Sequence, residues 1–191
     1  MRIGLLLFED VEELDFVGPW EVLSYVNKID EGSVEMISVG IGAPIRAFNG
    51  LRFLPDVTLG DCPELDILIV PGGKGRLRQM YEKATLDFLR DRYPHLKYLA
   101  SVCTGSLILA EAGLLEGKKA TTHHSAYDEL DEYPEIELVR DRVVRDGKVI
   151  SAGGVASGID LAFDLVEELF GDEVASGVRR GIEYSRAHRT K

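Results

Sequence analysis

The chain has 191 residues, of which 45% are hydrophobic and 29% are charged, and its formal net charge is −11 at pH 7. This length suits one domain with a filled core, and the composition is too apolar for a disordered chain. The acidic charge disfavours nucleic acid and anionic lipid as partners, because both require a basic surface. The apolar start, Met1–Phe8, is too short for a signal peptide or a membrane span. We expect one cytoplasmic domain, residues 1–191, that does not bind nucleic acid or membranes.

The cysteine and histidine content argues against a structural disulfide and a metal site. The only cysteines are Cys62 and Cys103, and a reducing compartment keeps both as thiols. The histidines lack the close pairing with cysteines or carboxylates that zinc sites show. We therefore expect no metal.

The first half of the chain alternates strand and helix patterns. Pro19 suits the first turn of a helix, and Asn49-Gly50 between apolar flanks is a strong hairpin signal. The expected elements are a strand Arg2–Phe8, a helix from Pro19 through about Val26, a strand Val34–Val39, a hairpin Ile45–Leu54, a buried strand Ile67–Val70, and a helix capped by Thr85 that runs to about Tyr93.

The second half continues the alternation. The expected elements are a buried strand Tyr98–Val102, a helix Thr104–Ala112, a strand Lys119–Thr122, a short helix Ser125–Glu132, a hairpin of Arg142–Arg145 with Lys148–Ser151, a helix from Ser157 or Gly158 to Phe170, and after Gly171 a last helix from Asp172 to about Tyr184. This order predicts an α/β fold, a mostly parallel sheet with helices on both faces in a three-layer αβα sandwich. In such folds, sites gather where strands end.

Cys103 lies at one such point, between an apolar strand and a helix in the run Tyr98-Leu-Ala-Ser-Val-Cys-Thr-Gly-Ser106. Unpaired N–H groups at the helix start stabilise a thiolate, and the small neighbouring residues leave room for a nucleophile elbow. A buried structural cysteine is the alternative, because free thiols are often buried.

Asp15 belongs to the acidic loop Glu9–Val17, where it alone of the five acidic residues stands between two apolar neighbours. A carboxyl buried beside a sulfur retains its proton more readily and can act as an acid or a base. Asp15 can equally cap the helix that follows.

Four further residues are candidates near the same strand ends. Gly72 and Gly73 can offer N–H groups to a developing negative charge, or simply make a turn. Thr104 can donate its hydroxyl to a substrate, or pack in the helix. His123 follows a predicted strand, where a structural histidine is the commoner case; its neighbour His124 is a weaker candidate still. Cys62 has no helix start after it, and we expect no catalytic role for it.

Several separate motifs together resemble the PfpI/ThiJ superfamily, within the class I glutamine amidotransferase-like, flavodoxin-like folds. They are Leu14-Asp-Phe-Val-Gly-Pro-Trp-Glu-Val22, Val70-Pro-Gly-Gly73, Ser101-Val-Cys-Thr-Gly-Ser106, Ala112-Gly-Leu-Leu-Glu-Gly-Lys118, Ala120-Thr-Thr-His123 and Gly153-Gly-Val-Ala-Ser-Gly-Ile-Asp160. The Asp-Phe-x-Gly-Pro and Cys-Thr-Gly forms look most like the isocyanide (isonitrile) hydratase branch and the sensory domains of AraC-type regulators. The chain ends soon after the last predicted helix, so we expect no helix-turn-helix module.

The resemblance implies a nucleophile at Cys103, a carboxyl partner at Asp15, a second site residue at Thr104, and an oxyanion-type pocket at Gly73. It also implies a homodimer with its site near the subunit interface. The implied reaction hydrates an isocyanide, a small-molecule substrate, to an N-substituted formamide without a cofactor. Two alternatives remain, a glyoxalase-type aldehyde activity and a non-enzymatic module that senses a ligand or oxidation. Protease activity is disfavoured, because Thr104 occupies the place after the nucleophile.

Overall fold

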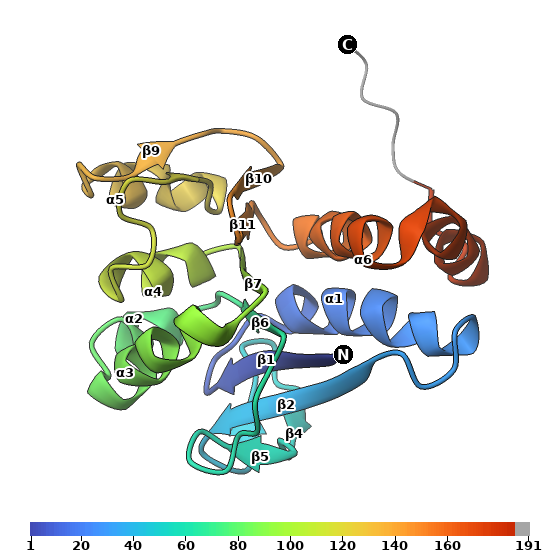
Figure 1. The fold of residues 1–191 in the computed structure, drawn as a ribbon. Helices are drawn as coiled ribbons and strands as arrows, with labels where there is room; N and C mark the ends of the chain where they lie inside the picture. Colours follow the sequence, from blue (N-terminus) through green and yellow to red (C-terminus); the bar gives the residue numbers. More distant parts are fainter. Residues whose placement is uncertain (186–191) are drawn as a thin grey trace.

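A seven-stranded sheet forms the middle of the molecule (Figure 1). The computed structural model describes residues 1–185. Six strands are parallel, and the edge strand β10 alone runs antiparallel, to β11. In spatial order the strands are β10 (Val143–Asp146), β11 (Val149–Ala152), β7 (Tyr98–Val102), β6 (Ile67–Val70), β1 (Arg2–Phe8), β2 (Glu35–Ile41) and β5 (Val57–Thr58).

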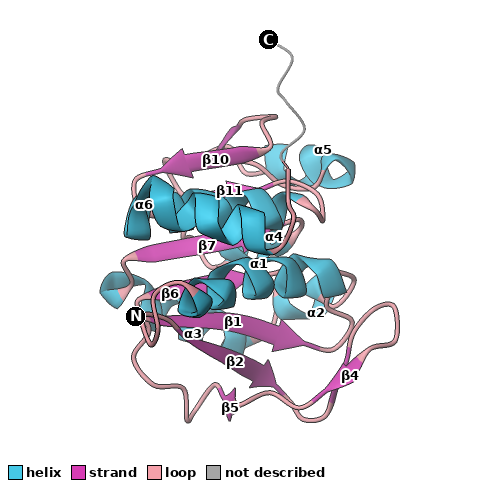
Figure 2. Ribbon diagram, turned by 90° about the vertical axis from the view of Figure 1, so that its right-hand side faces the viewer, coloured by secondary structure: helices cyan, strands magenta, loops and turns pink. Residues whose placement is uncertain are grey.

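Helices cover both faces of this sheet. Figure 2 shows α1 and α6 together in front of the strands, and the remaining helices lie on the far face. The bounds are α1 (Glu13–Tyr25) and α6 (Ser157–Gly181) on the first face, and α2 (Arg76–Gln79), α3 (Lys83–Arg92), α4 (Gly105–Glu111) and α5 (Tyr127–Asp131) on the second. Short 3-10 turns cover Val26–Lys28, Tyr93–His95 and His124–Ala126. The predicted three-layer α/β sandwich is confirmed.

The central strands lie in the core because helices bury both of their faces. All four residues of β6 are fully buried, as are Ile3, Leu5 and Leu6 of β1. Burying each such side chain contributes about 1.5–3 kcal/mol. Unbroken apolar runs, rather than alternating ones, follow from this two-sided burial.

Two small sheets flank the main one. The predicted hairpin forms β3 (Ile45–Arg46) and β4 (Arg52–Phe53), which pair antiparallel beside the main sheet. The predicted strand at Lys119–Thr122 is shorter: β8 (Lys119–Ala120) pairs in parallel with β9 (Glu137–Leu138), outside the main sheet.

Several helix boundaries differ from the predictions. Helix α1 begins at Glu13, and Pro19 lies inside it. The prediction placed Pro19 in the first turn, where proline is most common, whereas it is the seventh residue of α1 and removes one interior backbone hydrogen bond of the helix. Thr85 does not cap α3; its buried hydroxyl donates to Gln79 at 2.7 Å. Helix α6 covers both predicted C-terminal helices, with non-helical backbone at Gly171 where a break was predicted.

Candidate active site

Asp15 lies in the first turn of α1, directly after β1, and its side chain is fully buried. Its Oδ2 accepts the backbone N–H of Gly72 at 2.9 Å. The N-cap position belongs to Glu12, so Asp15 does not cap the helix. The carboxyl instead joins the start of α1 to the loop after β6.

Burial controls the protonation of Asp15. It raises the pKa of this carboxyl to about 7, against the lowering effect of the Gly72 N–H; the charge of Glu12 raises the pKa further and the Cys103 thiol lowers it. Among the described residues, no N–H or O–H group donates to Asp15 Oδ1, which is the oxygen left to exchange a proton. A carboxyl with a pKa near neutrality is suited to both accepting and donating a proton.

Cys103 occupies a strained turn between β7 and α4. Its φ of 57° lies in the left-handed region, which costs a non-glycine residue roughly 1–2 kcal/mol. Hydrogen bonds hold both ends of the residue: its N–H donates to the carbonyls of Ala152 (3.0 Å) and Gly153 (2.9 Å), and its own carbonyl accepts the hydroxyls of Ser106 (3.2 Å) and Thr122 (3.1 Å). The predicted sharp strand-to-helix turn is therefore present at Cys103, and its role as a nucleophile elbow stays a prediction.

The surroundings of Cys103 favour the thiol over the thiolate that the sequence-based argument predicts. Burial, and after it the negative charge of Asp15, raises the pKa of this thiol to about 12. The N–H groups of Thr104 and Val155 and the Thr104 hydroxyl lower the pKa, but by less. The sequence-based argument counted these donors and missed the desolvation of a sulfur in a residue only 7% exposed. Cys103 therefore rests as a thiol beside a proton acceptor.

Gly72 and Gly73 form the loop after β6, and their N–H groups donate to side chains of the site. Gly72 N–H binds Asp15, and Gly73 N–H donates to the Thr104 hydroxyl at 3.2 Å. A Cβ at Gly72 would lie 2.5 Å from that hydroxyl oxygen, so only glycine allows Thr104 to approach. The predicted substrate-binding role of these two N–H groups stays a prediction, and their observed role is to hold Asp15 and Thr104 in place.

His123 lies at the edge of this arrangement. Its Nδ1 is 2.8 Å from the Ser125 hydroxyl, and its ring centroid is 4.2 Å from that of His124. Burial, with a smaller contribution from His124, lowers the pKa of His123. Within residues 1–185 no hydrogen bond joins His123 to Cys103 or Asp15, so a substrate contact for it stays a prediction.

Sequence reasoning missed two contributors, the N–H of Val155 and the hydroxyl of Thr122. Val155 follows Gly153-Gly154 at the end of β11, the strand beside β7. The glycine pair marked a tight loop at a strand end, which is where sites gather in this fold. Thr122 ends a predicted strand and belongs to the Ala120-Thr-Thr-His123 motif, but neither signal places its hydroxyl against Cys103, because that contact depends on the packing of the segment after β8.

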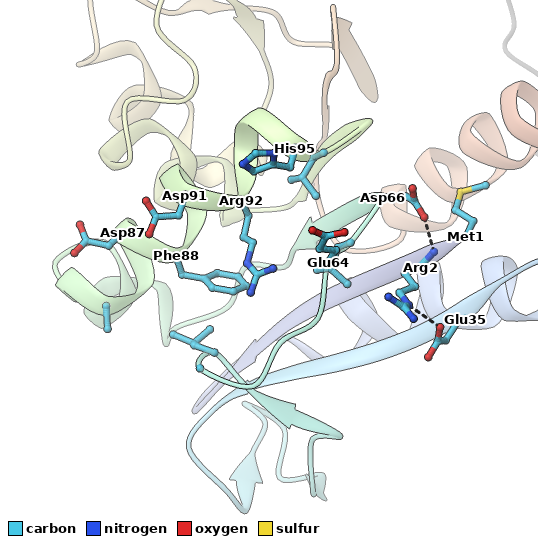
Figure 3. Close-up of a pocket in the computed structure, with 15 residues that line it drawn as sticks. Met1, Arg2, Glu35, Glu64, Asp66, Asp87, Phe88, Asp91, Arg92 and His95 are labelled. Carbon is cyan, nitrogen blue, oxygen red and sulfur yellow. Dashed lines mark hydrogen bonds and ion pairs between the residues drawn. The ribbon is translucent and has the colours of Figure 1, made fainter.

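A separate cavity of about 1140 Å³ lies at the opposite edge of the sheet, where the strands begin (Figure 3). Met1, Arg2 and Glu35 line it from the starts of β1 and β2, and Phe88 and Arg92 from α3. It contains none of the site residues described above. Within residues 1–185, no cluster of histidine, cysteine and acidic side chains is arranged to hold a metal ion, and no helix has the length and apolar character needed to cross a membrane.

Comparison with known proteins places this chain in a known family. Residues 1–168 match the DJ-1/PfpI family, and the chain belongs to that family. It is 42% identical over 187 residues to an isonitrile hydratase of Pseudomonas putida, covering 98% of this chain and 80% of that protein. It is 27% identical over 181 residues to a glutathione-independent glyoxalase of Caenorhabditis elegans, covering 93% of each chain.

A solved structure agrees with this assignment. The crystal structure of a ThiJ/PfpI family protein from Pseudomonas syringae superposes with a TM-score of 0.87 at 34% identity, covering 98% of this chain and 76% of the other. The family resemblance read from the sequence motifs is confirmed.

Proposed function

We propose that this protein is a cysteine-dependent enzyme that hydrates isocyanides to N-substituted formamides. The observation that carries the proposal is the buried Asp15 carboxyl, with a pKa of about 7, beside the Cys103 thiol. The 42% identity to an isonitrile hydratase supports the substrate class.

In the first step, the thiol adds across the terminal carbon of the isocyanide, R–NC. Asp15 takes the thiol proton at Oδ1 while the sulfur attacks the carbon, and then delivers the proton to the same carbon, where negative charge develops. A C–S bond and a C–H bond form, the S–H bond breaks, and the product is a thioimidate, R–N=CH–S–Cys103. No net charge accumulates, which suits a desolvated site.

In the second step, water adds to the thioimidate carbon. Asp15 removes a proton from the water as the water oxygen attacks the carbon, and delivers that proton to nitrogen, which gives R–NH–CH(OH)–S–Cys103. The C–S bond then breaks while Asp15 moves the hydroxyl proton to the sulfur, so the formamide R–NH–CHO leaves and the Cys103 thiol is restored. Thr104, whose hydroxyl oxygen accepts the Gly73 N–H and whose own proton is directed to the Cys103 sulfur, lies where it can hydrogen-bond the group attached to that sulfur.

The test supplies purified protein with p-nitrophenyl isocyanide and, separately, with methylglyoxal. The expected result is formamide formation by the wild-type protein and none by Cys103→Ser. Lactate formation without formamide would instead establish the glyoxalase activity carried by the 27% identical relative. Binding of ligands from both classes without turnover would point to a sensing module.

We also propose a homodimer. Exposed apolar side chains on α1 and on the β3–β4 hairpin lie next to one another, because Asn49 of the hairpin turn donates to Glu13. This surface consists of Leu14, Val17, Phe48, Leu51 and Leu54, each between 38% and 73% exposed. Contiguous exposed apolar surface marks sites of association. Light scattering at micromolar concentration is expected to give the mass of two chains, and the mass of one chain would refute the dimer.

A cytoplasmic location fits this chemistry. The proposed nucleophile is a free thiol, and Cys62 is a second one. A reducing compartment keeps both from oxidation.

A further inference from the structure

The carbonyl of Cys103 is an unusual feature of the elbow, since two side-chain hydroxyls donate to it. Ser106 comes from the next turn of the chain, whereas Thr122 comes from the segment after β8, nineteen residues away. Both donors are fully buried. The mechanism proposed above uses neither of them.

The left-handed backbone of Cys103 explains why its carbonyl needs such partners. A strained conformation persists only where surrounding contacts determine it. The N–H of the residue is held by the end of β11, through the carbonyls of Ala152 and Gly153. The Thr122 hydroxyl holds the carbonyl of Cys103 by a hydrogen bond, and it comes from a different segment of the chain.

His123, the residue after Thr122, packs against the loop that faces the Cys103 sulfur. The His123 ring packs over Gly154, where a Cβ would lie only 2.4 Å from the ring carbon Cδ2. Gly154 precedes Val155, whose N–H faces the Cys103 sulfur. Thr122 therefore holds the Cys103 peptide through its hydrogen bond, and His123 packs on the loop whose N–H donates to the Cys103 sulfur.

We propose that Thr122 is a positioning residue for the reaction at Cys103: its hydroxyl fixes the left-handed Cys103 peptide and thereby keeps the sulfur against Asp15. The inference rests on the proposed function for the reaction it serves, and on geometry alone for the placement of the thiol. Ser106, attached to the same turn as Cys103, moves with it and gives a weaker constraint.

The test replaces Thr122 by valine, which has the same shape and lacks the hydroxyl, and by serine, which retains it. Thr85→Val is the matched control, because Thr85 is also fully buried and donates to Gln79, on the α2–α3 side of the molecule. Two readouts are compared: kcat and KM for p-nitrophenyl isocyanide, and the pH dependence of Cys103 alkylation by iodoacetamide. Alkylation does not require isocyanide turnover, so it tests the placement of the thiol even if the proposed reaction is wrong.

We expect Thr122→Val to lower kcat about ten- to hundredfold with KM changed by less than about twofold, since small misplacements of a nucleophile affect chemistry more than binding. Its alkylation profile should move to higher pH as the sulfur loses its N–H donors, and Thr122→Ser should restore both values. Thr85→Val should lose comparable thermal stability and move neither. If Thr122→Val is recovered unfolded, Thr122→Ala carries the same comparison. An unchanged alkylation profile and kcat in a folded variant, or equal shifts in Thr85→Val, would overturn the proposal.

Discussion

The two cysteines of this protein are almost equally buried but lie in different surroundings. Cys103 is 7% exposed and Cys62 is 6% exposed, and burial raises the pKa of both thiols. Beside Cys62 stands the Arg92 guanidinium, which lowers the thiol pKa and donates to the carbonyls of Cys62 and Pro63. Beside Cys103 stands the Asp15 carboxyl, which raises it.

This contrast shows that a lowered thiol pKa is not what distinguishes the candidate nucleophile. The charge near Cys62 favours a thiolate more than the charge near Cys103 does, yet the Cys62 thiol donates to the Pro63 carbonyl, at 3.5 Å, and a carbonyl oxygen is not a base that can take up its proton. Cys103 has an acceptor, a strained backbone and a position at a strand end. A nearby base can activate a protonated nucleophile in this way.

Among the substitutions that test the difference between the two cysteines, Asp15→Asn should have the largest effect on activity. Asparagine has nearly the same shape but cannot exchange a proton, so formamide production should fall at least about a hundredfold. Circular dichroism should show a folded protein, and gel filtration should give an unchanged oligomeric state. Near wild-type turnover in this variant would remove Asp15 from the mechanism.

The same substitution is expected to stabilise the protein at alkaline pH. The pKa of Asp15 rises from 3.8 to about 7 on folding, so the folded state binds the proton more tightly than the unfolded state. Wild-type stability should therefore fall as pH rises from about 4 to about 7, by up to about 4 kcal/mol, and remain lower above pH 7. Asp15→Asn should lack this contribution. Urea unfolding at pH 5 and pH 8 measures the difference, and an equal pH dependence in both proteins would contradict the raised pKa.

Alkylation of the two thiols gives a further comparison. In the wild-type protein, iodoacetamide should label Cys103 slowly at mildly acidic pH, because the thiol is protonated there. Asp15→Asn removes a negative charge, so the Cys103 profile should move to lower pH while Cys62 serves as an internal standard. Mass spectrometry of peptides resolves the two sites. Rapid labelling of wild-type Cys103 near pH 6 would mean that the N–H donors outweigh burial.

The smallest expected effect comes from Arg92→Met on the other side of the contrast. Loss of the guanidinium should raise the pKa of Cys62 and move its alkylation to higher pH. The carbonyls of Cys62 and Pro63 lose their donors, so a modest loss of thermal stability should accompany the change. Labelling of Cys103 and formamide production should stay unchanged. A change in either would show that the surroundings of Cys62 and Cys103 are coupled.

The sequence by itself determined most of the succession of strands and helices along the chain, the strand-to-helix turn at Cys103 and the family, but not the strands Val57–Thr58 and Glu137–Leu138 or the spatial order of the sheet. The strands Arg2–Phe8, Ile67–Val70 and Tyr98–Val102 appear with the predicted bounds, because unbroken apolar runs between turn residues are a local signal. The sequence also placed Asp15, Gly72, Gly73 and Thr104 at one edge of the sheet, because parallel strands bring their carboxyl ends to the same edge.

Only the tertiary structure decided how these groups affect one another. The depth of burial that raises the pKa values of Asp15 and Cys103 depends on packing from α1, β6 and β7 at once, which no local pattern encodes. The start of α1 at Glu13, six residues before Pro19, turned Asp15 from a loop residue into a helix residue aimed at the Gly72 N–H. The contacts of Thr122 and Val155 with the elbow arise in the same way, because strand pairing and loop packing join residues far apart in the chain.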